Sequence, residues 1–295
     1  MKKVFDVAQK DAGKRLDAWM VGAISGCSRN RAKRLLDSGC VRIGGKRVYI
    51  AGWKMKAGDR VEINEELKGK VKTTFVKILF EDRDIIVAEK PAGILSVSSD
   101  AGDRSSFADQ IKGYLRRKYK TASYLKPVHR LDAETSGVMV FAKSKAGEAI
   151  EEQFKRHSIE RRYVAIVEGA VVKESGQIKA SLEKGEFGGG KKVRIAAGSE
   201  GVEAVTEYMV KEIYADATLL DVRVRTGRTH QIRVHLSEIG HPIVGDKLYG
   251  GKRPFPRQAL HAYKLSFRHP VTGKKMKFES KLPDDLAGLV DELRG

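Results

Sequence analysis

Apolar residues recur every three or four positions near the start of the chain, a spacing typical of an amphipathic helix. They are Leu16, Trp19, Met20, Ala23 and Ile24. A second helix is expected to begin at Ser28, a residue type that caps helix N-termini, and to end at Gly39, a residue type that follows helix C-termini. The pattern therefore predicts two consecutive helices in the N-terminal part of the chain.

The second predicted helix has an apolar side and a basic side, because successive residues advance by about 100°. The apolar side holds Ala32, Leu35 and Leu36, and the basic side holds Arg31, Lys33 and Arg34. A hairpin follows, with strands at 41–43 and 46–48 joined by Gly44 and Gly45, where a positive φ costs least. With a short strand at 61–63, these elements are expected to form one small module.

Beyond a polar stretch, strand and helix patterns alternate along the chain. Strands are expected at 84–88, 138–142, 163–167, 202–210 and 217–226, the last two with the alternation of half-buried antiparallel strands. Helices are expected at 106–118, with Ser106 and Asp109 as a capping box, at 146–157, and from a Thr229 cap to Gly240. The order indicates a mixed α/β fold of the α+β type, richer in strands than a doubly wound sheet.

The charge distribution points to a polyanionic partner. The chain has 57 Lys and Arg against 38 Asp and Glu, a net charge of +19. Residues 1–70 hold 17 basic and 8 acidic residues, so 17 − 8 leaves +9 in that segment. Binding to a nucleic acid would use such an excess through counterion release, although a generally basic solvated surface also fits.

Several classes of protein are not supported by the sequence. No apolar run approaches the ~18 residues of a membrane span, and the N-terminus does not resemble a signal peptide. Cys27 and Cys40 lack the paired spacing of a zinc site or a disulfide framework. The chain has no nucleophile elbow or dinucleotide fingerprint, and the glycine-rich run 188–192 is interpreted as a mobile loop. We therefore expect a soluble protein of the cytoplasm.

The N-terminal module resembles the small αα-β RNA-binding domain first noticed in a small-subunit ribosomal protein. The residues that carry the resemblance are Arg15-Leu16-Asp17, Ser28-Arg29, Ala32, Gly39, Val41, Gly45-Lys46 and Gly58-Asp59. The resemblance implies an RNA-binding domain at 12–66, followed by a linker at 67–76. RNA contacts are then expected from Arg29, Arg31, Lys33, Arg34 and Lys46, although the module could serve only as a folding cap.

Two charged clusters could carry chemistry in the larger part of the chain. Asp132 lies beside Arg130 in a polar turn just before an apolar strand, where it could be held ionised as a nucleophile or form a structural ion pair. The run 225–233 places three arginines around a predicted helix N-terminus, which would suit an anion, or a solvated basic surface. A zinc site is an alternative, because three histidines lie close together in the sequence, at His230, His235 and His241. The i, i+5 spacing of His230 and His235 would point the two rings apart.

The same region resembles the RluA-type pseudouridine synthases over residues 78–290. The residues that match are Lys90-Pro91-Ala92-Gly93, His129-Arg130-Leu131-Asp132 with Thr135-Ser136-Gly137, Tyr163, Ala165, Val167 and Gly169, Arg225 through His235, Gly240-His241-Pro242-Ile243, Gly245-Asp246, Tyr249-Gly250, Leu260-His261-Ala262 and His269-Pro270 with Thr272-Gly273. The chain departs from the family pattern at 95–103 and at Ala133-Glu134, which leaves the choice of target open.

The resemblance implies a catalytic domain at 77–295 with a central, mostly antiparallel sheet flanked by helices. It implies isomerisation of uridine to pseudouridine, with Asp132 as the nucleophile that attacks the ribose or the pyrimidine ring. The resemblance also implies roles for other residues. Arg233 would pair with Asp132, Tyr163 would stack on the flipped base, and Leu260 would form the apolar floor of the base pocket. RNA contacts would come from Arg130, Arg225 and Arg228.

The reaction requires no metal or cofactor, so none is expected. The expected partner is RNA, most readily large-subunit ribosomal RNA, with transfer RNA as the alternative. No membrane and no obligate protein partner is expected, and a monomer suffices. Two other functions remain open from the sequence: a non-catalytic RNA-binding factor of ribosome assembly, and a metal-dependent RNA hydrolase.

Overall fold

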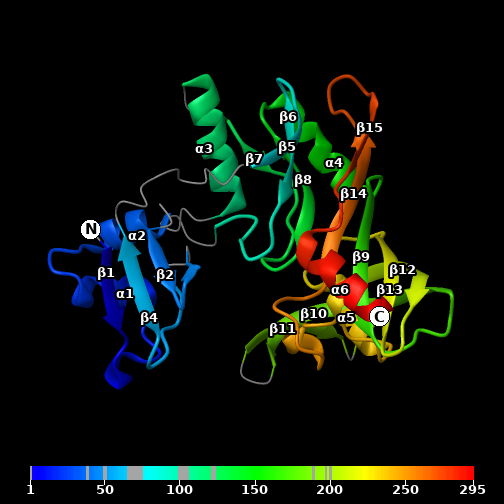
Figure 1. Ribbon diagram of the computed structural model, residues 1–295. Helices are drawn as coiled ribbons and strands as arrows, with labels where there is room; N and C mark the ends of the chain where they lie inside the picture. Colours follow the sequence, from blue (N-terminus) through cyan, green and yellow to red (C-terminus); the bar gives the residue numbers. More distant parts are fainter. Residues whose placement is uncertain are drawn as a thin grey trace. The chain divides into compact units, whose positions relative to one another are not determined.

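The computed structural model describes residues 2–37, 40–48, 52–64, 76–98, 106–120, 124–187, 190–196, 198 and 201–295. The chain forms two compact units, Met1–Phe75 and Val76–Gly295 (Figure 1). Most of the expected linker at 67–76 lies outside the described residues.

The first unit contains the two predicted helices, α1 (Leu16–Ala23) and α2 (Arg29–Asp37). The Ser28 hydroxyl accepts the Arg31 N–H at 3.2 Å, which confirms Ser28 as the cap of α2. The predicted end of this helix at Gly39 lies outside the described residues. The apolar side of α2 is buried in the core of the unit, as predicted, because Ala32, Leu35 and Leu36 are each at most 4% exposed.

A four-stranded antiparallel sheet completes the first unit, in the order β1-β4-β2-β3. Its strands are β1 (Lys2–Asp6), β2 (Val41–Ile43), β3 (Lys46–Arg47) and β4 (Arg60–Asn64). Gly44 and Gly45 have φ of 54° and 80°, which confirms the predicted two-residue turn between β2 and β3. Strand β1 was not predicted, and it pairs along its whole length with β4.

The second unit is built on an eleven-stranded sheet that runs β11-β10-β12-β13-β9-β14-β8-β6-β5, with β15 beside β14 and β7 beside β8. The strands are β5 (Lys77–Glu81), β6 (Ile85–Lys90), β7 (Lys126–Pro127), β8 (Ser136–Ala142), β9 (Glu160–Glu168), β10 (Ser175–Phe187), β11 (Gly190–Ile195), β12 (Val202–Ile213), β13 (Ala217–Val224), β14 (Leu260–Arg268) and β15 (Lys275–Glu279). Among the described strand pairs, β8 with β14 is the parallel one. The predicted mixed fold with a mostly antiparallel sheet is thus confirmed.

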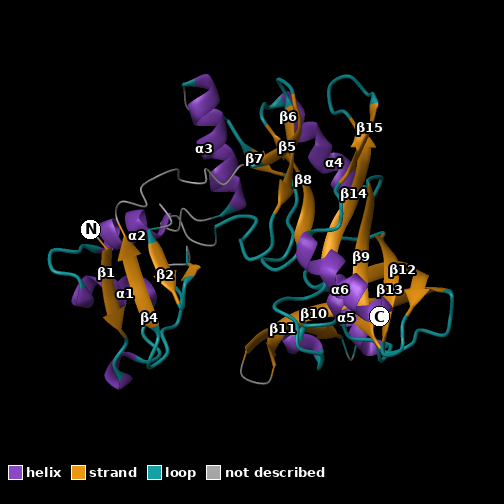
Figure 2. Ribbon diagram, in the orientation of Figure 1, coloured by secondary structure: helices purple, strands orange, loops and turns teal. Residues whose placement is uncertain are grey.

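Helices cover both faces of this sheet (Figure 2). Alternate residues of β6 and β8 point to opposite faces, so Ile86 and Met139 pack against α3 (Phe107–Tyr119), whereas Val87 and Val140 pack with Ile150 of α4 (Ile150–Lys155). Helices α5 (Gln231–Glu238) and α6 (Asp284–Arg294) pack with β9 and β13 farther along the sheet. The predicted capping box is present at the start of α3, between Ser106 and Asp109.

Several predicted details were wrong. The residue before α5 is His230, in the left-handed region with φ 54° and without a side-chain cap, so Thr229 does not cap the helix. Gly190 begins β11, so 190–192 is a strand rather than a loop, whereas 188 and 189 lie outside the described residues. The predicted helix at 146–157 is a short 3-10 turn followed by α4. None of the described helices has the length and hydrophobicity of a membrane span.

Candidate active site

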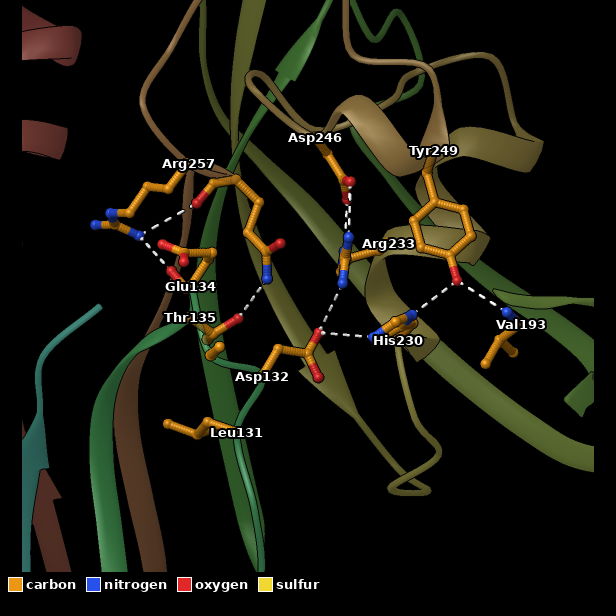
Figure 3. A network of polar contacts seen from close by, with 12 residues as sticks. Leu131, Asp132, Glu134, Thr135, Val193, His230, Arg233, Asp246, Tyr249 and Arg257 are labelled. Carbon is orange, nitrogen blue, oxygen red and sulfur yellow. Dashed lines mark hydrogen bonds and ion pairs between the residues drawn. The ribbon is translucent and has the colours of Figure 1, made fainter. Parts of the chain in front are cut away.

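Asp132 lies in the loop between β7 and β8, with its side chain 20% exposed. Arg233, in the first turn of α5, donates from Nη1 to Oδ2 of this carboxylate at 3.1 Å (Figure 3). The His230 Nε2 lies 3.9 Å from the same oxygen. Within the described residues Oδ1 has no hydrogen-bond or ion-pair partner. One oxygen is therefore held while the other is free to react.

Arg233 is itself fixed by a second carboxylate. Its Nε and Nη2 donate to Oδ2 and Oδ1 of Asp246 at 2.6 and 2.8 Å, and both side chains are almost fully buried. Burial lowers the pKa of Arg233, but the Asp246 and Asp132 carboxylates outweigh burial and raise it. The Tyr249 ring lies 4.9 Å from the guanidinium carbon, in cation–π contact. A cation held in this way stays charged and keeps one nitrogen directed at Asp132.

Three side chains hold the Asp132 loop in place. The Ser96 hydroxyl accepts the Leu131 N–H at 2.9 Å and donates to the Leu131 carbonyl at 2.6 Å. The fully buried Lys90 donates its three hydrogens to the carbonyls of Pro91, Ile94 and Ala133 at 2.8–2.9 Å. Gln258 donates to the Thr135 hydroxyl at 2.8 Å. The residues on both sides of Asp132 are thus tied to the end of β6 and to two neighbouring loops.

His129 of the same loop is part of its support. Its Nε2 accepts the Val140 N–H at 3.0 Å, and its ring stacks on Phe154 with the ring centres 4.7 Å apart. Burial, and to a lesser extent the Arg161 charge, lowers the pKa of His129 to about 3. The ring is therefore neutral and anchors the loop to β8.

Tyr163 and Leu260 lie on neighbouring strands of the sheet. Leu260 begins β14 and pairs with Ala165 of β9, two residues after Tyr163, so their side chains share one face. Leu260 is 3% exposed, and Tyr163 packs against the same core cluster. Burial raises the pKa of Tyr163. Arg161 opposes that rise, and the negative charge of Asp132 adds to it. The phenol is therefore un-ionised at neutral pH.

The residues predicted to contact RNA differ in their surroundings. Arg130 is exposed and has no hydrogen-bond or ion-pair partner among the described residues, whereas Arg225 forms an ion pair with Glu207 at 2.8 Å. Arg228 donates from Nε to the Glu203 carbonyl at 3.2 Å. In α2, Arg29 is exposed, and Arg31 and Lys33 are half-buried. The side chains of Arg34 and Lys46 lie outside the described part of the structure.

The three histidines that were weighed as zinc ligands have other partners. His230 Nδ1 lies 2.8 Å from the Tyr249 hydroxyl, and His235 Nδ1 lies 2.9 Å from the Thr206 hydroxyl. His241 Nδ1 donates to the Glu168 carbonyl at 2.9 Å. Among the described residues, no group of three or more His, Cys, Asp or Glu side chains is placed to hold a metal ion.

Sequence reasoning gave no role to several residues that form this site. Asp246, Tyr249 and Lys90 stand among the residues that match the family, but their contacts depend on how the chain folds. His230 was considered only as a metal ligand. Ser96 lies in the stretch that departs from the family pattern, so nothing in the sequence singled it out.

Comparisons with known proteins identify the family of this chain. Residues 84–238 match the family described as RNA pseudouridylate synthase, and residues 14–61 match the S4 domain. The chain is 34% identical to an uncharacterized RNA pseudouridine synthase of Aquifex aeolicus, covering 96% of this chain and 95% of that protein. It is also 34% identical to the ribosomal large subunit pseudouridine synthase D of Zymomonas mobilis, covering 93% and 92%.

A solved structure has the same fold as the larger part of this chain. The human RNA pseudouridylate synthase domain containing 4 superposes with a TM-score of 0.64 at 24% identity, covering 78% of this chain and 98% of that one. The family match spans more than half of the chain, including the Asp132 loop, Tyr163 and Arg233. The chain therefore belongs to the RNA pseudouridylate synthase family and is an RNA-modifying isomerase with an S4 domain.

Proposed function

We propose that this enzyme converts uridines of large-subunit ribosomal RNA to pseudouridine, with Asp132 as the nucleophile. The contact between Arg233 Nη1 and Asp132 Oδ2 carries the proposal, since it holds the carboxylate and leaves Oδ1 free. The ribosomal target rests on relatives such as the Zymomonas mobilis enzyme, which is named for the large ribosomal subunit. An enzyme with this substrate would work in the cytoplasm, where bacterial ribosomes are assembled, and a monomer would suffice.

The reaction moves the ribose bond from N1 of the base to C5. Asp132 attacks either the ribose anomeric carbon or the pyrimidine ring and forms a transient covalent bond. The base is detached, turned and rejoined through C5. The proton lost from C5 is matched by the proton gained at N1, so the net reaction is an isomerisation. Tyr163 stacks on the base and assists transfer of the C5 proton, and Leu260 forms the apolar floor of the base pocket.

The target uridine has to leave its helix to reach Asp132, which costs a few kcal/mol of unstacking. Arg130 is suited to fill the vacated space because it is exposed and lies two residues before Asp132. Arg225 and Arg228 would contact flanking phosphates. For this, Arg225 must break its ion pair with Glu207 and bind a phosphate instead. The basic residues of the first unit, Arg29, Arg31, Lys33, Arg34 and Lys46, would bind more distant RNA.

The proposal is tested by mapping pseudouridine in total RNA from cells that lack the gene and carry either the wild type or Asp132→Asn. Wild type should restore specific sites in large-subunit RNA. Asp132→Asn should restore none, yet should bind the same RNA with an affinity within a few-fold of wild type. Sites restored only in transfer RNA would overturn the target, and an active Asp132→Asn would overturn the nucleophile.

A further inference from the structure

The Tyr249 hydroxyl determines which nitrogen of His230 carries the hydrogen. This hydroxyl accepts the Val193 N–H at 3.1 Å and lies 2.8 Å from His230 Nδ1 (Figure 3). It has one hydrogen to donate, and within the described residues the only acceptor it meets is Nδ1. The ring therefore accepts at Nδ1 and carries its own hydrogen on Nε2, the nitrogen nearest Asp132.

His230 is also held in a backbone conformation that few residues other than glycine adopt. Its φ of 54° lies in the left-handed region, and it directly precedes α5, which carries Arg233. Burial lowers the pKa of His230 and the Asp132 carboxylate opposes that shift, so the neutral ring is favoured at neutral pH. Backbone strain of this kind collects at functional sites, where the surrounding structure enforces it.

From this geometry we infer that His230 is a positioning residue for Asp132. With its tautomer set by Tyr249, it supplies a second donor to Oδ2 beside Arg233 and keeps Oδ1 turned toward the substrate. The Nε2 to Oδ2 distance is 3.9 Å, so a shift of about 1 Å on substrate binding completes the hydrogen bond. Tyr249 contacts both donors, His230 through its hydroxyl and Arg233 through its ring, which packs on the guanidinium. The inference rests on the proposed role of Asp132 as nucleophile.

Two substitutions of His230 separate positioning from structure. An asparagine amide reaches about as far as Nδ1, so His230→Asn keeps a partner for Tyr249 and loses the donor to Asp132. A glutamine amide reaches about as far as Nε2, so His230→Gln keeps that donor. Backbone strain alone predicts the opposite order of activity, since asparagine tolerates the left-handed region better than glutamine.

The measurement is single-turnover conversion of the RNA identified by mapping, together with RNA affinity and melting temperature. His230→Asn should lower the rate constant by about 10- to 100-fold, as a misplaced reacting group does, with RNA affinity unchanged. His230→Gln should stay within about fivefold of wild type. Tyr249→Phe should lower the rate less than His230→Asn, and the double variant should be no slower than His230→Asn, since both act through one contact.

The control is Tyr263→Phe, which removes a hydroxyl that donates to Asp221 at 3.1 Å and has no contact with the Asp132 network. It should leave the rate unchanged. Equal rates for His230→Asn and His230→Gln, whether normal or reduced, would overturn the inference. An Asp132→Asn variant in the same assay separates the two proposals: if it is inactive while His230→Asn is normal, only the role of His230 fails.

Discussion

Asp246 accepts two hydrogen bonds from Arg233, at 2.6 Å from Nε and 2.8 Å from Nη2, and so leaves Nη1 directed at Asp132. One arginine thereby links the buried carboxylate of Asp246 to the partly exposed carboxylate of Asp132. The buried member sets the orientation, because a planar guanidinium held at two nitrogens cannot turn. The geometry of the Asp132 carboxylate therefore depends on a residue 114 positions later in the chain (246 − 132).

Asp246→Asn should impair both stability and rate. It removes the charge that compensates buried Arg233, and breaking a buried ion pair costs about 3 kcal/mol of the free energy of unfolding. The loosened guanidinium should also lower the turnover rate by at least about tenfold. Urea unfolding and single-turnover assays check the two effects. As a control, Asp216→Asn breaks the exposed pair with Arg253 and should cost less than about 1 kcal/mol, with a normal rate.

Ser96→Ala should loosen the loop that carries Asp132. The hydroxyl satisfies both the N–H and the carbonyl of Leu131, and its removal leaves two buried backbone groups unpaired. We expect a loss of about 2 kcal/mol in the free energy of unfolding, with a lower turnover rate and an unchanged affinity for RNA. Ser158→Ala, which removes an exposed hydroxyl contact to the Gln153 carbonyl, is the control. A Ser96→Ala protein as stable and fast as wild type would contradict this account.

The sequence predicted most of the helices, strands and turns that are determined by residues close together in the chain. The helices at α1, α2 and α3, the turn at Gly44 and Gly45, and the strands β8 and β9 follow from periodicity, capping and turn chemistry within a few residues. Strand β1 was missed because its five residues gain their structure from pairing with β4, far along the chain. The Thr229 cap was wrong because His230 and Gln231 reshape the turn before α5, where the Gln231 side chain accepts the Arg228 N–H.

In the candidate site, too, some residues could be predicted from the sequence, whereas others depend on contacts between distant parts of the chain. Asp132, Tyr163 and Arg233 were assigned by resemblance to a family, and the Arg233 contact to Asp132 fits that expectation. The residues that orient them could not be assigned, since a periodic pattern does not report which distant side chains meet. Lys90 is the clearest case. The sequence marks it only as one of the residues that match the family, whereas the fold buries it completely beneath the Asp132 loop.

Burial lowers the pKa of Lys90 to about 7, against the attraction of Glu134 and Asp132. In the unfolded chain the pKa is about 10.4, so between these values the unfolded state binds more protons than the folded state. The free energy of unfolding should then rise with pH across this window, by up to about 1.4 kcal/mol per pH unit from this group. Lys90→Met lacks the titrating amine, so the difference in free energy of unfolding between wild type and variant gives the contribution of Lys90.

The measurement is urea unfolding of both proteins between pH 6 and pH 9. The stability of the wild type should increase relative to Lys90→Met as the pH rises above about 7. A constant difference would mean that the three carbonyls keep the ammonium group protonated throughout, since each of them receives one of its hydrogens.

Gly137 of β8 pairs with Ala262 of β14, in the parallel strand pair that follows the Asp132 loop. Its φ is 128°, and an added Cβ would lie 2.2 Å from the Ala262 carbonyl oxygen. Gly137→Ala should therefore destabilise the protein by at least about 3 kcal/mol, because backbone strain and overlap with a backbone atom add. Gly288 in α6 has open space around its Cβ position, so Gly288→Ala should instead stabilise by about 0.5–1 kcal/mol. Thermal unfolding of the two variants compares a glycine that the fold requires with one that it does not. A Gly137→Ala protein as stable as wild type would show that β8 and β14 can move apart at this position without a loss of stability.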